Sequence, residues 1–360
     1  MDAARLRAAF PVLQRTAYLN AGTCGPLAAA AVQAGQDAER LALEEGRATA
    51  YYGRLMDLRQ RLRAAYAAVL GGRAEDVALT TGTSEGLVTV LLGLPLGEGD
   101  EVLTSQTEHP GLLGPLIAAR ERLGITVRTA PLAELPEAVG PRTRLVACSH
   151  VDWTSGAIAP TAGLAGLDVP VLLDGAQGVG AVDVDVEGLG CDFYAGSGQK
   201  WMCGPVGTGM LWVSPAWRER LVATGPTYVA LADPSAGLGA RLRDDAGRFD
   251  TPAMSLATVA TALAAHDLLA DAGWPEVRAR AREQAAWLAD RLADAGRVVA
   301  PRAATTLVSW ELDEPVARVE ALAAAGVVVR SLPGTPYVRA SVGAWNDEDD
   351  LDRLLAAIAP

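Results

Sequence analysis

Short apolar runs rich in β-branched residues alternate with longer helical patterns over the first two thirds of the chain. Several of these runs are apolar on both faces, as parallel strands buried between helices are. Two helices are predicted between them, over Ser84–Leu94 and Gly111–Leu123. The alternation predicts an α/β fold with a large, doubly wound, mostly parallel sheet. The predicted strands are Val77–Thr80, Glu101–Thr104, Ile125–Thr129, Leu145–Ser149, Val171–Leu173, Phe193–Ala195 and Met210–Val213.

The pattern changes after Pro252, where long helices dominate and the strands become short. We expect a smaller α+β domain there, and we place the large domain at 16–255 and the small domain at 1–15 together with 256–360. The expected helices are Ser255–Ala272, Trp274–Ala295 and Asp347–Ile358, and the expected strands lie around Thr306–Trp310 and Val327–Arg330.

Composition limits the classes of function. The 360 residues carry a net charge of −12, which argues against nucleic-acid and anionic-membrane partners. No apolar run reaches the roughly 18 residues of a membrane span, and the N-terminus lacks the apolar core of a signal peptide. The four cysteines are scattered and the three histidines lack metal-ligand spacing, so we expect a cytoplasmic protein with reduced thiols and no metal.

Lys200 is the only lysine among 31 basic residues. An arginine cannot deprotonate in a protein, whereas a lysine can act as an amine nucleophile and form a Schiff base with a carbonyl. A leftover surface lysine is the simpler explanation. The dense loop sequence around Lys200, Gly-Ser-Gly-Gln-Lys-Trp-Met-Cys-Gly-Pro, favours a functional role instead.

Three further groups fall where predicted strands end, which is where open α/β sheets bind ligands. Thr81–Gly86 joins a strand to a helix and offers backbone N–H groups and hydroxyls to an anion, although an ordinary helix N-cap would look the same. This segment lacks the spacing of a P-loop or of a dinucleotide-binding loop. His109 could be a plain loop imidazole, and Asp174 could be an N-cap. Gly175 and Gly178 after it permit a close approach.

Taken together, the Thr81–Gly86 segment, His109, Asp174 and Lys200 are more specific than any one of them alone. A phosphate cradle, a flat imidazole, a buried carboxylate and a lone lysine in this chain order suit one ligand, pyridoxal 5′-phosphate (PLP). The phosphate needs the cradle, the ring a stacking partner, the pyridine nitrogen a carboxylate and the aldehyde an amine.

The chain resembles the class V aminotransferase family of fold-type I PLP-dependent enzymes, which includes cysteine desulfurases, isopenicillin-N-epimerase-like proteins, kynureninases and C–S lyases. The resemblance covers nearly the whole chain, and the pair Asp-Gly-Ala-Gln and Ser-Gly-Gln-Lys-Trp is its strongest signature. The motifs that carry it are Tyr18–Leu27, Thr81–Gly86, Glu108–Pro110, Leu173–Gln177, Ser197–Trp201, Phe249–Pro252 and Val338–Asn346.

The resemblance implies a role for each matching residue. Lys200 would hold PLP as a Schiff base and later move the Cα proton, Asp174 would pair with the pyridine nitrogen, and His109 would stack on the ring. Gln177 would contact the ring hydroxyl, and Thr251 would reach the phosphate of a partner's site in a homodimer. The phosphate would be held by Gly82, Thr83, Ser84, Ser197 and Gln199. The expected substrate-side residues are Arg339, which would bind the α-carboxylate, Asn20 and Trp153.

Two departures from the cysteine desulfurase pattern narrow the expected reaction. The loop Val328–Arg339 contains no cysteine, so a persulfide relay is disfavoured. Trp153 stands where desulfurases have Asn, which favours the epimerase-like or kynureninase-like branches. Cys203 is expected to be a small buried filler, and a chemical role for Cys24 is left open.

The expected reaction starts from an external aldimine of an α-amino acid, from which Lys200 removes the Cα proton. A C–S (β-)lyase acting on a cysteine-derived substrate is slightly favoured, and an aminotransferase or an epimerase is the alternative. A catalytically idle PLP-binding protein and a nucleotide-binding α/β protein are the rivals from other classes. All the core residues of the PLP set are present and no DNA-binding module or basic patch is appended, which argues against the first. The absence of both phosphate-loop fingerprints argues against the second.

Overall fold

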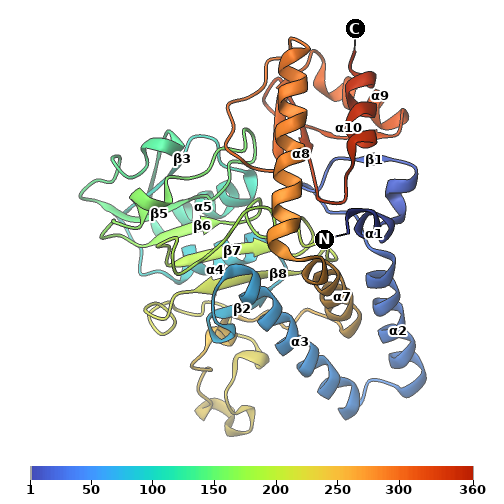
Figure 1. Ribbon diagram of the computed structural model, residues 1–360. Coiled ribbons are helices and arrows are strands. Elements are labelled where there is room, and N and C mark those ends of the chain that lie inside the picture. The colour runs from blue at the N-terminus through green and yellow to red at the C-terminus, as the bar shows by residue number, and fades with distance from the viewer. Residues whose placement is uncertain (1, 360) are drawn as a thin grey trace.

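The computed structural model describes residues 2–359 and is built around a seven-stranded sheet (Figure 1). The strand order is β2-β8-β7-β6-β5-β3-β4, and all neighbours are parallel except β8, which runs antiparallel to β2 and β7. The mostly parallel sheet and the seven strands predicted for it are therefore confirmed. The strands are β2 (Val77–Thr80), β3 (Glu101–Ser105), β4 (Thr126–Ala130), β5 (Thr143–Ser149), β6 (Val171–Asp174), β7 (Phe193–Ser197) and β8 (Gly209–Val213).

Helices cover both faces of this sheet, because successive residues of a strand point to opposite faces. In β2, Ala78 joins the core beneath α4 (Thr83–Gly93) and α5 (Pro110–Leu123). Its neighbours Val77 and Leu79 join the core beneath α3 and α7 on the other face. The remaining helices of this part are α2 (Ala29–Glu45), α3 (Thr49–Leu70), α6 (Thr161–Leu164) and α7 (Leu256–Ala272).

The C-terminal part forms a second layer around a three-stranded antiparallel sheet of order β11-β12-β9. Its apolar core includes Leu288, Trp310, Val338 and Leu351, all buried. A separate two-stranded parallel pair joins β1 to β10. The elements are β1 (Ala17–Tyr18), α8 (Trp274–Asp294), β9 (Leu307–Glu311), α9 (Pro315–Ala324), β10 (Val327–Val328), β11 (Arg330–Ser331), β12 (Tyr337–Ser341) and α10 (Glu348–Ala357).

The N-terminal helix α1 (Ala3–Ala8) is tied to the C-terminal part, since Arg7 forms a 2.6 Å ion pair with Asp350. Helix α7, by contrast, packs against α2 and α3 beside the large sheet. The division at residues 15/16 and 255/256 stays a prediction. Short 3₁₀ helices complete the chain: η1 (Pro11–Gln14), η2 (Ala74–Asp76), η3 (Leu132–Glu134), η4 (Tyr228–Ala230), η5 (Pro234–Gly239) and η6 (Ala246–Phe249).

The structure differs from the expected pattern in a few places. The Ala-rich helices α2 and α3 were not expected, because alanine gives little contrast between an apolar and a polar face. The single strand expected around Val327–Arg330 is two short strands, β10 and β11, which pair with different partners. Across residues 2–359, we find no helix that is both long enough and apolar enough to cross a bilayer.

Candidate active site

A cavity of about 330 Å³ lies at the carboxyl ends of β2, β6 and β7. It brings together most of the residues predicted to hold a cofactor, although they come from distant parts of the chain. Gln177, Thr251 and the three substrate-side residues are not part of its lining. The lining residues are Thr81, Gly82, Thr83, Ser84, Glu85, His109, Gly111, Asp174, Ala176, Ser197, Gln199 and Lys200.

Lys200 follows β7 and faces Asp174 at the end of β6. Burial, opposed by Asp174 and aided by the guanidinium groups of Arg339 and Arg330, lowers the pKa of the Lys200 amine to about 8. Burial likewise raises the pKa of Asp174, while Lys200 and a 2.9 Å hydrogen bond from the Ala176 N–H lower it. A lysine with such a pKa has an appreciable neutral fraction near neutral pH, which imine formation requires.

The start of α4 forms the anion-binding part of the cavity. The hydroxyls of Thr83 and Ser197 are buried and have no hydrogen-bond partner among residues 2–359. Unpaired buried hydroxyls are costly, and a phosphate would accept hydrogen bonds from both at a helix N-terminus. These residues, together with the amine of Lys200 and the carboxylate of Asp174, fit PLP.

His109 is the N-cap of α5. Its Nδ1 accepts a 2.9 Å hydrogen bond from the backbone N–H of Gly111. Burial, and then the positive charges of Lys200, Arg330 and Arg339, lower the pKa of this imidazole to about 4. His109 is therefore neutral at neutral pH, and a neutral flat ring suits stacking on a pyridine ring.

Glu108, which precedes His109, is a buried residue whose role the sequence did not reveal. Its carboxylate accepts 2.6 Å hydrogen bonds from the hydroxyls of Ser105 and Ser149 and a 3.0 Å bond from the Ser149 N–H. Glu108 thus ties the end of β3 to the end of β5 directly beside the imidazole. Burial still raises the pKa of this carboxyl group.

In the loop after Asp174, both glycines pack against the side chain of Tyr194. A Cβ at Gly175 would lie 2.0 Å from Tyr194 Cε1, and one at Gly178 would lie 2.2 Å from the Tyr194 hydroxyl. Gln177 between them donates a 2.8 Å hydrogen bond to Gly22 O and accepts a 3.0 Å bond from the indole of Trp201. The close approach permitted by these glycines is therefore that of the Tyr194 ring.

Arg339 lies on β12 and is fully buried. Its Nη1 donates a 2.6 Å hydrogen bond to Trp153 O, while Nε and Nη2 have no partner among the described residues. Burial and Arg330 lower its pKa to about 9, against the effect of Asp152. Arg339 is thus still a cation at neutral pH with two free donors, as a carboxylate ligand requires.

The side chain of Asn20 hydrogen-bonds within its own loop. Its side-chain oxygen accepts a 2.8 Å hydrogen bond from the Thr23 hydroxyl, and its backbone bridges Ser341 on β12. A Cβ at Gly22 would come within 2.9 Å of Arg339 Nη2. The N-terminal loop therefore lies against the free edge of this guanidinium.

Arg330 is a second guanidinium of the site that the sequence did not single out. It stands directly opposite Arg339 in the β11–β12 pair and donates a 3.1 Å hydrogen bond to the Thr23 hydroxyl. In a chain whose positive charge is almost entirely arginine, composition offered no signal for it. Directly opposed residues project from the same face of a sheet, where like charges repel.

The other candidates lie around the cavity. Thr251 is buried, and its N–H donates a 2.9 Å hydrogen bond to Leu79 O at the end of β2. Cys203 is fully buried with a left-handed φ of 53°, and burial raises its pKa well above the usual value. Cys24 is half-buried.

Comparison with known proteins agrees with this geometry. A family model described as "Aminotransferase class-V" matches residues 42–354. The isopenicillin N epimerase of Streptomyces clavuligerus is 32% identical over 327 residues, which cover 82% of this chain and 75% of the epimerase. A probable cysteine desulfurase of Halalkalibacterium halodurans is 28% identical over 321 residues, or 78% of this chain and 76% of the desulfurase.

Two solved structures of C-DES match almost end to end. A C-DES mutant with glycine covalently linked to its PLP cofactor gives a TM-score of 0.93 at 27% identity, covering 98% of this chain and 99% of C-DES. The complex of "the cystine C-S lyase C-DES" with its product cysteine persulfide gives 0.92 at 28% identity, covering 98% and 100%. The chain therefore belongs to the class V aminotransferase family and is a PLP-dependent enzyme of fold type I.

Proposed function

We propose that this enzyme is a C–S lyase that cleaves a cysteine-derived amino acid bearing two carboxylates, such as cystine. The observation that carries this proposal is the pairing of Arg330 with Arg339 on one face of the small sheet. Both guanidinium groups act on the pKa of Lys200, so both lie within electrostatic reach of the reactive amine. Two fixed cations repel each other unless anions lie between them, and a dicarboxylate supplies two.

Each residue of the site has a role in this reaction. Arg339, with its two free donors, binds the α-carboxylate, and Arg330 binds the distal one. The neutral Lys200 amine takes the proton from Cα of the substrate. Asp174 would keep a proton on the pyridine nitrogen of PLP, and His109 would stack on its ring. PLP supplies the electron sink for the pair left at Cα.

The further roles expected of Gln177, Thr83, Ser84, Ser197 and Gln199 are part of the same proposal. The unpaired hydroxyls of Thr83 and Ser197 support phosphate binding. Gln177 already uses one N–H on Gly22 O, so its second N–H is the one available to the ring hydroxyl.

A lyase is favoured over two alternatives. The C-DES structures match over almost the whole chain, and the Val328–Arg339 loop has no cysteine to carry a persulfide to an acceptor protein. An epimerase is the second candidate, because the epimerase of Streptomyces clavuligerus is 32% identical. An aminotransferase has no comparable observation in its favour beyond the family itself.

The test is the set of products formed from cystine. Water-consuming β-elimination should convert one cystine to pyruvate, ammonia and cysteine persulfide. Keto acid formed only with an added amino acceptor would indicate a transaminase, and loss of optical rotation without pyruvate would indicate an epimerase. Either result would overturn the proposal. Arg330→Met should raise KM for cystine about tenfold and leave S-methylcysteine, which has one carboxylate, nearly unaffected.

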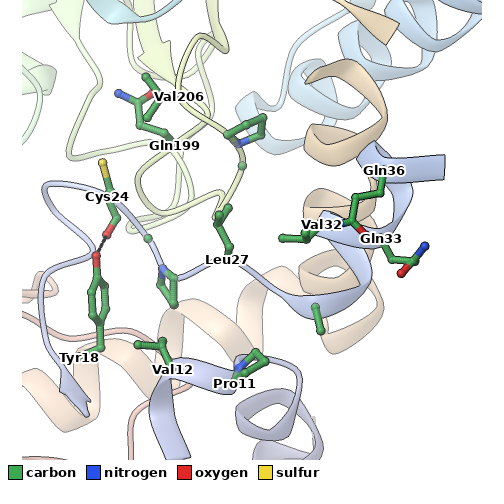
Figure 2. A pocket seen from close by; sticks show the side chains of 15 residues that line it. Pro11, Val12, Tyr18, Cys24, Leu27, Val32, Gln33, Gln36, Gln199 and Val206 are labelled. Carbon is green, nitrogen blue, oxygen red and sulfur yellow. Dashed lines mark hydrogen bonds between the residues drawn. The ribbon is translucent and has the colours of Figure 1, made fainter. Parts of the chain in front are cut away.

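We also propose that two copies of the chain associate and share their sites. An apolar cavity of about 700 Å³ opens beside Gln199 between the N-terminal loop and residues 204–206 (Figure 2). Leu27, Val32 and Val206 around it remain exposed, Val206 by 74%. Sedimentation velocity should show a dimer, and Val206→Asp should shift it towards monomer. In this proposal Thr251 contributes to the partner's phosphate site.

A further inference from the structure

The turn formed by residues 152–156, which we call the interdomain turn, lies between the large sheet and the small sheet. It follows β5, and its conformation is set by Asp152, whose Oδ1 accepts hydrogen bonds from the N–H groups of Thr154 at 2.9 Å and Ser155 at 2.6 Å. Gly156 ends it with a left-handed φ of 82°. Asp152 and Trp153 are both buried.

On the large-sheet side, the interdomain turn is fixed twice to Thr107. The Thr107 hydroxyl donates to Asp152 Oδ2, and Thr107 O accepts a 2.9 Å hydrogen bond from the Trp153 indole N–H. The Trp153 ring meets His109 edge-on, with 4.9 Å between centroids and an angle of 87° between planes. The imidazole is therefore held between the perpendicular Trp153 ring and the N–H of Gly111.

On the small-sheet side, the same turn accepts hydrogen bonds from three side chains. Arg339 Nη1 donates to Trp153 O at 2.6 Å, Ser309 donates to Thr154 O, and Thr305 donates to Gly156 O at 2.9 Å. A Cβ at Gly156 would lie 2.7 Å from the Thr305 hydroxyl, so the contact is close. Trp153 thus touches His109 through its ring and Arg339 through its carbonyl.

We propose that the interdomain turn sets the orientations of Arg339 and His109 together, with Trp153 as the positioning residue for both. This inference rests on the carboxylate-binding role of Arg339 and the stacking role of His109 given above. It adds that one element aligns the substrate carboxylate with the cofactor ring. Trp153 acts through its neighbours and does not itself take part in the chemistry.

The physical reason is the small number of contacts that hold each group. The fully buried Arg339 guanidinium has a single protein acceptor, Trp153 O, so the position of that carbonyl determines where Nε and Nη2 point. The carbonyl is in turn held by the indole bond to Thr107 O. Loosening Thr107 or the indole therefore displaces both functional groups, whereas the unpaired Thr104 hydroxyl on β3 has no such path.

Two variants and one matched control test this. Thr107→Val removes the hydroxyl bond to Asp152 at nearly constant shape, and Trp153→Phe removes the indole bond but keeps an aromatic edge. Thr104→Val is the control for the same Thr-to-Val change, because the Thr104 hydroxyl is buried on β3, unlike the exposed Thr107, and has no partner among residues 2–359. Glycine and methylamine are the probes for the holoenzyme, since both offer an amine but only glycine carries a carboxylate.

We expect Thr107→Val and Trp153→Phe to weaken glycine binding about fivefold, the equivalent of one lost hydrogen bond, and to leave methylamine binding nearly unchanged. KM for cystine should rise more than kcat falls. The imidazole NMR signals should shift for His109 alone, with His150 and His266 as internal references, because the chain has only three histidines. Thr104→Val should change none of these readouts.

The inference is overturned if glycine and methylamine weaken equally, or if Thr107→Val behaves like Thr104→Val. Should Trp153→Phe fail to fold, Thr107→Val alone decides. The glycine measurement does not depend on lyase activity. A wild-type enzyme that binds glycine tightly but releases no pyruvate from cystine would therefore refute the proposed function and leave the interdomain turn to be judged separately.

Discussion

The Tyr194 hydroxyl lies 2.9 Å from Nδ1 of His150, and this buried pair supports the loop that begins at Asp174. A Cβ at Gly178 would fall 2.2 Å from that hydroxyl and 2.8 Å from that nitrogen. The pair therefore limits how closely the loop can pack against the sheet, and so helps to position the Asp174 carboxylate at the edge of the sheet.

Gly178→Ala should destabilise the protein by about 1–3 kcal/mol, the usual cost of overpacking a core, and should weaken PLP binding. Tyr194→Phe removes the hydroxyl that the new methyl group would meet. The double variant should therefore recover part of the loss. Urea unfolding of the four proteins in a double-mutant cycle measures this coupling, and simple additivity of the two single effects would show that the contact is not the cause.

Glu108→Gln should preserve the ties between Ser105 and Ser149, because an amide oxygen can accept from the Ser105 hydroxyl and the Ser149 N–H while the amide N–H donates to the Ser149 hydroxyl. The folded-state pKa of Glu108 is raised above 4.5 by burial. The native carboxyl group therefore contributes most stability below pH 4.5 and loses it as pH rises through the folded-state pKa.

Between pH 4.5 and 7, the free energy of unfolding of Glu108→Gln should accordingly increase relative to that of the wild type. Glu108→Ala, which leaves the serine groups without an acceptor, should be about 3 kcal/mol less stable than Glu108→Gln at both ends of this range. A wild-type protein that gains stability over Glu108→Gln with rising pH would contradict the burial argument. Chemical denaturation at several pH values makes the comparison.

The rate at which the apoenzyme takes up PLP covalently should rise with pH around a midpoint near 8. Only the neutral amine attacks an aldehyde, and burial lowers the pKa of Lys200 from 10.5 to about 8. Stopped-flow absorbance measures the rate. A midpoint close to 10.5 would mean that the amine is solvated in the apoenzyme.

Lys200→Arg should retain the fold and the positive charge but lose turnover, because a guanidinium forms no imine. The wild-type holoenzyme should show an absorbance band at about 420 nm that borohydride abolishes, and the variant should show neither the band nor the change. Peptide mapping should then find the pyridoxyl group on Lys200. A wild-type protein that stays colourless with added PLP would contradict the assignment.

The sequence predicted the parts of the site that are local. Apolar runs bounded by turn residues located the strands. Thr83, Asp174 and Lys200 lie at the ends of strands or shortly after them, so their meeting at one sheet edge follows from the parallel topology. Arg330 was missed because its significance comes from the partner across β11–β12. A contact made by a backbone carbonyl, such as that of Trp153 with Arg339, leaves no trace in residue identity either.

Because Lys200 is the single lysine of the chain, cleavage by a lysine-specific protease can measure the fraction of molecules that carry the cofactor. An endoprotease specific for lysine can cut the unfolded chain at a single bond, that between Lys200 and Trp201. A lysine carrying a reduced pyridoxyl group is no longer a substrate. After reduction and denaturation, the uncut fraction on a gel therefore equals the fraction of molecules whose site was loaded.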